Sequence, residues 1–298
     1  MWPIRSMLFV PGHKLDWIAK APKYGPDAVV IDLEDAVPTA DKAAAREITR
    51  TGIAKLAAAG VGAFVRINAL DQGGLDDTLA IATPGLAGIM LPKSRTPEEV
   101  RALDNRLSFG EGKAGLEYGS VSILVLPETP EGLADARALA QASARVKGVV
   151  GVIGGPVGGD VARAVGFRPT IEGSEQLYLA SKLVLDSRAG DAPHPMASII
   201  GTKIEDLDAI RRLVGRAKAL GYSGAVLIHP SHVAIANELF TPTKEEIEYY
   251  SGLVAAFQAA EQSGSAAVRY KGAMVDYAMR LYAEGILREG KRRGLLGV

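Results

Sequence analysis

Four carboxylates follow short apolar runs of the sequence, at points where a buried strand would end: Glu34, Asp35, Glu128 and Asp160. Like charges gathered at one edge of a fold repel one another, and a divalent cation relieves that repulsion. Oxygen ligands favour a hard ion such as Mg²⁺, with Mn²⁺ as an alternative. Two such ligands would leave positions for a chelating substrate, whereas a lone carboxylate at a strand end can equally cap the next helix.

Arg66 ends another apolar run, where a guanidinium is costly to bury without an anionic partner. A substrate carboxylate bound by two parallel hydrogen bonds would satisfy it. A structural ion pair with Glu34 or Asp35 is the alternative. Lys42 and Arg46, four residues apart on a predicted helix, can pair with the same acids or face solvent.

The segment from Gly151 to Asp160 contains five glycines. Pro156 interrupts it, and the G-x-G-x-x-G spacing of dinucleotide-binding loops is absent. A turn of this kind lets backbone amides approach a small carboxylate or a thioester. Histidines that could hold zinc are scattered and form no pair with ligand spacing: His13, His194, His229 and His232. His229, before Pro230, also fits a strand-end residue that hydrogen-bonds to the backbone.

Eight short runs rich in Val, Ile and Leu could position these side chains. They are Met7–Val10, Ala28–Asp32, Ala63–Ile67, Gly88–Leu91, Val121–Leu126, Val149–Ile153, Ala197–Ile200 and Ala225–Ile228. Most are continuous rather than alternating, which is typical of parallel strands buried on both faces. Helical patterns separate them: Thr39–Ala59, with Thr39 and Asp41 as cap candidates, Gly132–Ala144, Ser174–Ala189 and Glu205–Leu220. We expect an α/β fold, a closed (β/α)₈ TIM barrel, with an open doubly wound sheet as the alternative.

The pattern changes after Pro242, which predicts a barrel over residues 1–243 and a helical extension over 244–298. Lys244–Gln262 and Met274–Arg288 are expected to be helices, separated by a Ser-Gly-Ser break. The extension has no strand left to cover, so it must pack outside the barrel, on a neighbouring subunit or over the active site.

Composition narrows the function classes. The chain has 34 basic and 34 acidic residues, so neither nucleic acid nor an anionic membrane is expected as a partner. No apolar run is long enough to span a bilayer, and the short N-terminal run predicts a strand rather than a signal peptide. The absence of cysteine excludes disulfides and thiolate chemistry. We expect a cytoplasmic enzyme that acts on a small molecule.

Several motifs in order carry a family resemblance. They are Arg5–Gly12, Asp32–Val37 with Lys42 and Arg46, Val65–Asn68, Leu91-Pro92-Lys93, Glu128-Thr129, Ile228-His229-Pro230 and Lys271–Asp276. Together they resemble the citrate lyase beta-subunit-like family of CoA-ester lyases, within the HpcH/HpaI aldolase/citrate lyase superfamily. The match runs from Arg5 to about Pro242 and resumes at Lys271.

The resemblance implies a homotrimeric or hexameric barrel that cleaves a 3-hydroxyacyl-CoA, of the malyl- or citramalyl-CoA type, into acetyl-CoA and a 2-oxo acid. It implies the following site: Glu128 and Asp160 on Mg²⁺; Arg66, Gly158 and Gly159 on the substrate; Lys20 and His229 on the coenzyme A part; and Arg66, Glu34 and Asp276 in catalysis. Asp276 would sit on a lid that covers a neighbouring subunit's site, with Gly272 giving the backbone freedom for closure.

The stretch between Gly154 and Asp160 departs from the family, whose relatives carry a shorter Gly-x-x-Asp turn. The extra residues can reshape the pocket for the 2-oxo acid. Two other functions remain open: a class II aldolase on free hydroxy-oxo acids without CoA, and a non-catalytic barrel subunit. Asp276 and its lid argue against the first, and the intact set of site residues argues against the second.

Overall fold

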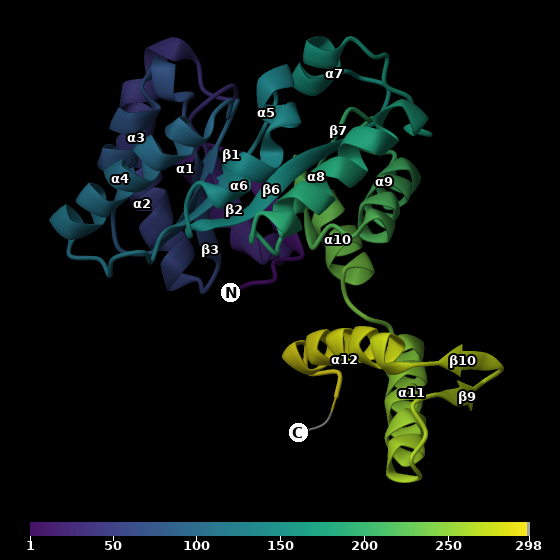
Figure 1. The fold of residues 1–298 in the computed structure, drawn as a ribbon. Coiled ribbons are helices and arrows are strands. Elements are labelled where there is room, and N and C mark those ends of the chain that lie inside the picture. Colours follow the sequence, from purple (N-terminus) through teal and green to yellow (C-terminus); the bar gives the residue numbers. More distant parts are fainter. Residues whose placement is uncertain (297–298) are drawn as a thin grey trace. The chain divides into compact units, whose positions relative to one another are not determined.

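Eight parallel strands form a closed barrel in the computed structural model, which describes residues 1–296. The strands are β1 Ser6–Pro11, β2 Ala28–Asp32, β3 Gly62–Arg66, β4 Leu86–Leu91, β5 Ser122–Val125, β6 Val146–Gly154, β7 Met196–Ile200 and β8 Gly224–Leu227. Each strand pairs with the next in sequence, and β1 also pairs with β8, which closes the ring. Figure 1 shows helices on the outside of these strands. The eight predicted strands and the (β/α)₈ barrel are therefore confirmed, and the open sheet is excluded.

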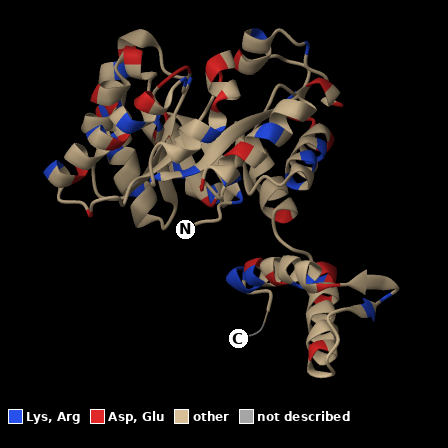
Figure 2. Ribbon diagram, in the orientation of Figure 1, with Lys and Arg blue, Asp and Glu red and all other residues tan. Residues whose placement is uncertain are grey.

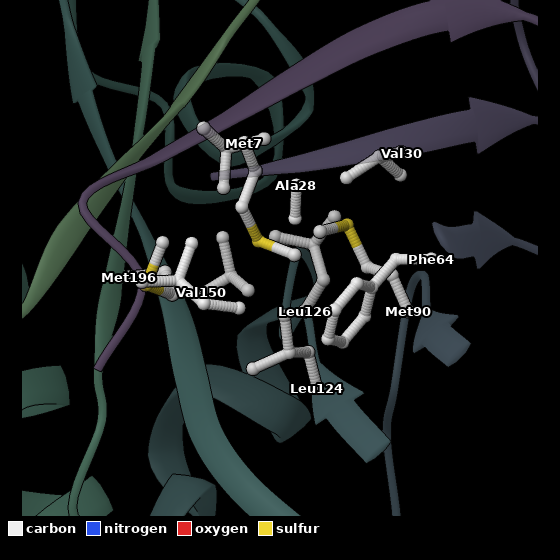
Figure 3. Packing of buried hydrophobic residues seen from close by; sticks show 11 residues of the cluster. Met7, Ala28, Val30, Phe64, Met90, Leu124, Leu126, Val150 and Met196 are labelled. Carbon is white, nitrogen blue, oxygen red and sulfur yellow. The ribbon is translucent and has the colours of Figure 1, made fainter. Parts of the chain in front are cut away.

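The barrel interior explains why the strands are apolar along their whole length. One face of each strand points inward and the other packs on a helix, so β2 is buried at every position. Figure 3 shows side chains from different strands converging on one core, among them Met7, Phe64, Met90 and Leu124. This core closes the space inside the barrel beneath the strand ends, which leaves the rim for chemistry.

Helices alternate with the strands around the barrel. They are α1 Leu15–Lys20, α2 Lys42–Ala58, α3 Gly74–Ile81, α4 Pro97–Ala114, α5 Pro130–Ala134, α6 Ala136–Gln141, α7 Asp160–Val165, α8 Leu177–Ala189, α9 Leu207–Leu220 and α10 Val233–Leu239. The helix expected at Thr39–Ala59 starts as a 3₁₀ turn, and the side chain of Asp41 makes no cap hydrogen bond to α2. The helix expected at Gly132–Ala144 is divided at Asp135 into α5 and α6.

The chain divides into two compact units, Met1–Glu238 and the part that begins at Leu239. The second unit contains α11 Lys244–Gln262, a hairpin of β9 Val268–Tyr270 and β10 Ala273–Val275, and α12 Tyr277–Arg292. It has its own core of four buried residues: Leu253, Phe257, Val275 and Ala283.

The hairpin corrects the prediction for this extension. Met274 lies in β10 rather than at the start of a helix, and the last helix begins at Tyr277. Lys271 and Gly272 both have positive φ, 43° and 89°, as the tight turn between two antiparallel strands requires. Gly272 therefore serves the hairpin turn in this structure, and nothing in that geometry identifies it as a hinge.

Along the barrel helices, Lys and Arg residues are interspersed with Asp and Glu residues (Figure 2). Basic residues gather at the C-terminal end of α12, where their positive charges interact favourably with the negative end of the helix dipole. Among residues 1–296, no helix combines the length and the apolar composition that a bilayer crossing requires.

Candidate active site

Arg66 is held by a carboxylate directly beside it on the neighbouring strand. Asp32 and Arg66 end β2 and β3 at the same level of the sheet. Nε and Nη2 of Arg66 donate to the two oxygens of Asp32, each at 2.7 Å. Its Nη1 lies 3.0 Å from Oε2 of Glu34 and 3.8 Å from Oδ2 of Asp35, and the guanidinium lies over the ring of Phe9. The structural ion pair with Glu34 or Asp35, which was the alternative for Arg66, is therefore present, but Asp32 is the main partner.

Glu34 is buried between two cations. Besides facing Arg66, its Oε1 accepts a hydrogen bond from Nζ of Lys93 at 2.7 Å. Burial raises the pKa of Glu34, although Arg66 and Lys93 both oppose the shift. Lys93 has a φ of 48°, a backbone region that residues other than glycine rarely adopt, and its Nζ also lies 3.5 Å from Asp35.

Lys42 and Arg46, which we expected near Glu34 and Asp35 or in solvent, pair with other groups. Nζ of Lys42 donates to Oδ1 of Asn68. Nε of Arg46 donates to Oδ1 of Asp77 at 2.8 Å. These two cations therefore fix α2 against the loop after β3 and against α3, rather than neutralising the rim.

Glu128 and Asp160 come from neighbouring segments of the rim, after β5 and at the first position of α7. Oε2 of Glu128 is buried and has no hydrogen-bond partner. Burial raises the pKa of Glu128 to about 7; Arg66 lowers it, while Glu34 and Asp160 raise it further. Oδ1 of Asp160 accepts a hydrogen bond from Nη2 of Arg163 at 2.6 Å. A partly exposed pair of carboxylates with one unsatisfied oxygen fits a hard divalent cation.

A cavity of about 340 Å³, the main cavity, brings Arg66, Glu128, Gly159 and Asp160 together. Its floor is apolar and consists of core residues at the top of the barrel: Met90, Leu126 and Val150. In the described part of the chain, no group of three or more His, Asp or Glu residues is placed to hold a metal. Any metal here would therefore use few protein ligands.

The loop between β6 and α7 is fastened to the end of β7. Backbone N–H groups of Gly155 and Val157 donate to the carbonyls of Ile200 and Gly201, at 2.9 and 3.0 Å. A Cβ on Gly155 would lie 2.7 Å from the carbonyl oxygen of Gly201, so only glycine allows this approach. The pinned loop places Gly158 and Gly159 beside the carboxylates with no side chain to obstruct the site.

A second cavity of about 460 Å³, the outer cavity, opens beside β1 and β8 and contains Lys20 and His229. It shares four lining residues with the main cavity: Phe9, Val10, Pro11 and Ile228. Trp17 and Tyr24, both more than half exposed, complete its wall. Nδ1 of His229 accepts a hydrogen bond from the backbone of Ser231 at 3.3 Å, which agrees with the structural interpretation of this histidine.

Comparison with known proteins identifies the family. Residues 5–230 match the family model of HpcH/HpaI aldolase/citrate lyase. The chain belongs to this family. It is 36% identical over 290 residues to the citrate lyase subunit beta-like protein of Deinococcus radiodurans, which covers 95% of this chain and 96% of that protein.

Two further proteins are similar to this aldolase/citrate lyase family member over most of its length. Mitochondrial citramalyl-CoA lyase of Mus musculus is 28% identical, covering 96% of this chain and 85% of that protein. Protein CitE of Mycobacterium tuberculosis, solved in complex with magnesium, acetoacetate and coenzyme A, is 26% identical with a TM-score of 0.71, covering 96% of this chain and 97% of that one. The family member described here is accordingly a lyase.

Asp276 is the one predicted site residue that lies in the second unit. It is exposed, and its Oδ1 accepts a hydrogen bond from the backbone of Met279 at 3.1 Å. It thus caps α12.

Two residues next to the predicted site had no role assigned from the sequence. Asp32 was taken only as part of the strand-end motif, and Lys93 only as a motif residue after β4. A usable signal existed for Asp32, because two residues that end consecutive parallel strands lie at the same height when the strand ends are level. No comparable signal identified the pairing of Lys93 with Glu34, which depends on an unusual backbone angle.

Proposed function

We propose that this lyase cleaves a 3-hydroxyacyl-CoA thioester, of the malyl- or citramalyl-CoA type, into acetyl-CoA and a 2-oxo acid, with Mg²⁺ held by Glu128 and Asp160. The observation that carries the proposal is the buried, unpartnered Oε2 of Glu128 beside Asp160, in a cavity that continues into a second one. Relatives named for citrate lyase and citramalyl-CoA lyase, and a neighbour bound to magnesium and coenzyme A, support it.

The reaction breaks the bond between C2 and C3 of the acyl group. The C3 hydroxyl loses its proton, and C3 becomes the carbonyl carbon of the 2-oxo acid. The electron pair of the broken bond passes to the thioester as an enolate, which gains a proton at carbon to give acetyl-CoA. Mg²⁺, when bound, supplies Lewis-acid stabilisation of the developing negative charge.

Arg66 assists at the oxygens where that charge develops. Burial lowers the pKa of Arg66, but the hydrogen bonds to Asp32 and the charges of Asp32, Glu34 and Glu128 together raise it above its ordinary value, so the guanidinium stays charged. Because Asp32 grips the guanidinium at two points, Arg66 is fixed before substrate arrives, as electrostatic preorganisation requires. Glu34 was expected in catalysis, and we propose that it acts by positioning: it fixes Arg66 on one side and Lys93 on the other.

The outer cavity suits the coenzyme A part of the substrate. Lys20 offers a cation for phosphate, and Trp17 and Tyr24 offer aromatic faces for an adenine ring or a pantetheine chain. Since this cavity joins the main cavity through Phe9 and Ile228, the thioester carbonyl can lie next to the carboxylates while the remainder extends outward. Gly158 and Gly159 would border the 2-oxo acid half.

A homotrimer or hexamer is part of the proposal, with Asp276 of one subunit acting at a neighbour's site. The second unit carries large apolar side chains in solvent, such as Met274 and Tyr282, 67% and 66% exposed, which favours a protein partner. Asp276, exposed at the start of α12, would give or take the proton at the methyl carbon of acetyl-CoA.

The decisive experiment is an assay of hydroxyacyl-CoA thioesters with and without Mg²⁺. Malyl-CoA and citramalyl-CoA are incubated with the full chain, and acetyl-CoA release is followed. We expect turnover of at least one thioester with Mg²⁺, and its loss after EDTA treatment with recovery on adding Mg²⁺. Full activity in EDTA, or activity confined to free hydroxy-oxo acids without CoA, would overturn the proposal.

A further inference from the structure

A small side pocket of about 30 Å³ opens beneath the loop that joins β6 to α7. It shares Glu128, Asp160 and Gly159 with the main cavity, so the two spaces meet at the carboxylates. Its walls are mainly apolar and include Val152, Val161, Ala162, Phe167 and Ile200. A space of this size has room for about one or two carbon atoms.

Gln176 also lines this side pocket, and its amide is already engaged. Oε1 of Gln176 accepts from the backbone N–H of Gly154 at 2.9 Å, and its Nε2 donates to the carbonyl of Gly154 at 3.1 Å. These paired bonds hold the end of β6 and leave the amide little capacity for a ligand. The described residues that line the side pocket include no Lys, Arg or His.

Cations are equally scarce in the main cavity. Arg66 is the one basic side chain among the described residues that line it, and two of its nitrogen atoms are taken by Asp32. Four carboxylates line the same space: Asp32, Asp35, Glu128 and Asp160. A bound divalent cation and Arg66 balance one carboxylate of a substrate. Lys93 and Arg163 contact Asp35 and Asp160 but do not line the cavity. A second substrate carboxylate would therefore meet no further basic side chain among the described lining residues, which is costly in a partly desolvated site.

We propose that the 2-oxo acid half of the substrate carries a methyl or ethyl substituent, seated in the side pocket, and no second carboxylate. This inference rests on the proposed function and narrows it. The side pocket adjoins Glu128 and Asp160 on one side of the main cavity, and the outer cavity joins it through Phe9 and Ile228. A substrate whose oxygens lie between Glu128 and Asp160 therefore directs its thioester to the outer cavity and its substituent to the side pocket.

Direct binding of 2-oxo acids tests the inference without turnover. Glyoxylate, pyruvate, 2-oxobutyrate and oxaloacetate are titrated calorimetrically into the full chain at saturating Mg²⁺. We expect pyruvate to bind about fourfold more tightly than glyoxylate, equivalent to about 0.8 kcal/mol for one buried carbon. We expect oxaloacetate to bind at least tenfold more weakly than pyruvate. Oxaloacetate that binds as tightly as pyruvate would overturn this inference alone, whereas failure of all four acids to bind would count against the proposed function.

A matched pair of variants locates the substituent. Ala162→Leu fills the side pocket, whereas Ala164→Leu adds the same carbons to α7 at a position that does not line it. We expect Ala162→Leu to weaken pyruvate and 2-oxobutyrate at least tenfold while glyoxylate stays within about twofold, which also shows that the variant is folded. Ala164→Leu should match the wild type with all of them. Equal weakening of glyoxylate and pyruvate by Ala162→Leu would place the substituent elsewhere.

Discussion

At the scale of single residues, Glu128 is a carboxyl group whose ionisation is unfavourable in the folded protein. Its folded-state pKa of about 7 lies above the ordinary value because burial disfavours the ionised form. The protonated carboxyl therefore contributes stability that is complete below the ordinary pKa near 4.5 and is lost as pH rises through about 7. The metal-free protein is strained at this position at neutral and alkaline pH, which is the condition that a cation relieves.

Glu128→Gln should have opposite effects on the stability of the metal-free protein and on Mg²⁺ binding. Without metal at pH 8, we expect the variant to exceed the wild type in free energy of unfolding by on the order of 1 to 3 kcal/mol, with the gap narrowing toward pH 4.5. The same variant should lose Mg²⁺ binding, because an amide oxygen carries no charge. Denaturant unfolding in EDTA at pH 8 and 5, with calorimetry for Mg²⁺, measures both effects.

Glu131→Gln is the control for this experiment, because Glu131 is an exposed glutamate on the adjacent helix α5. It should change neither stability nor Mg²⁺ affinity. Coincident unfolding curves for Glu128→Gln and the wild type at pH 8 would mean that the buried carboxylate is not strained.

At the scale of elements, a buried ion network holds together the strands that lead to the two carboxylates. Arg145, just before β6, donates from Nη1 and Nη2 to Glu111 of α4 at 2.7 and 2.6 Å, and from Nε to Asp104 at 2.6 Å. Glu111 also accepts the backbone N–H of Val121, just before β5, at 3.0 Å. The network therefore ties the starts of β5 and β6, whose other ends lead to Glu128 and Asp160.

Arg145→Met tests the strength of this link. Removing the guanidinium leaves Glu111, 1% exposed, as a buried charge without its partner, so we expect a loss of about 3 to 5 kcal/mol in the free energy of unfolding. Arg101→Met, which removes an exposed cation paired with Glu98 on the same helix, should cost less than about 1 kcal/mol. Equal losses in the two variants, measured by denaturant unfolding, would show that burial adds nothing to the network.

The elements also show what could be predicted from the sequence and what could not. Continuous apolar runs predicted all eight barrel strands, because parallel strands in a barrel have two buried faces. The hairpin of β9 and β10 was missed, since its strands have three residues each and lie beside a strong helical pattern. The acidic rim was predicted from its position after strands. The two hydrogen bonds between Arg66 and Asp32 depend on strand register, and the side pocket depends on loop packing. A residue pattern specifies neither the register nor the packing.

At the scale of the whole molecule, the proposed sharing of the site between subunits predicts complementation between two inactive variants. Asp276→Asn should keep the cap of α12, because Asn and Asp cap helices about equally well. It should also keep Mg²⁺ and pyruvate binding while kcat falls at least about a hundredfold, roughly 2.7 kcal/mol. Loss of activity would then report on proton transfer rather than on folding.

Mixing Asp276→Asn with Arg66→Ala under subunit exchange distinguishes a shared site from a site within one subunit. In an equal mixture with random exchange in a ring, about a quarter of the sites combine an intact Arg66 from one subunit with an intact Asp276 from its neighbour. We expect activity to recover toward that fraction as exchange proceeds, followed by acetyl-CoA release. A mixture that stays inactive although labelled subunits have exchanged would contradict the shared site.

The single passage of the chain between its two units, after Glu238, has an evolutionary consequence. The family match over residues 5–230 falls entirely within the first unit, and the second unit keeps a core of its own around Phe257. A segment joined at one point can be replaced by recombination without repacking the barrel. The barrel and the second unit can thus be inherited separately, so relatives can diversify the second unit while retaining the same carboxylates in the barrel.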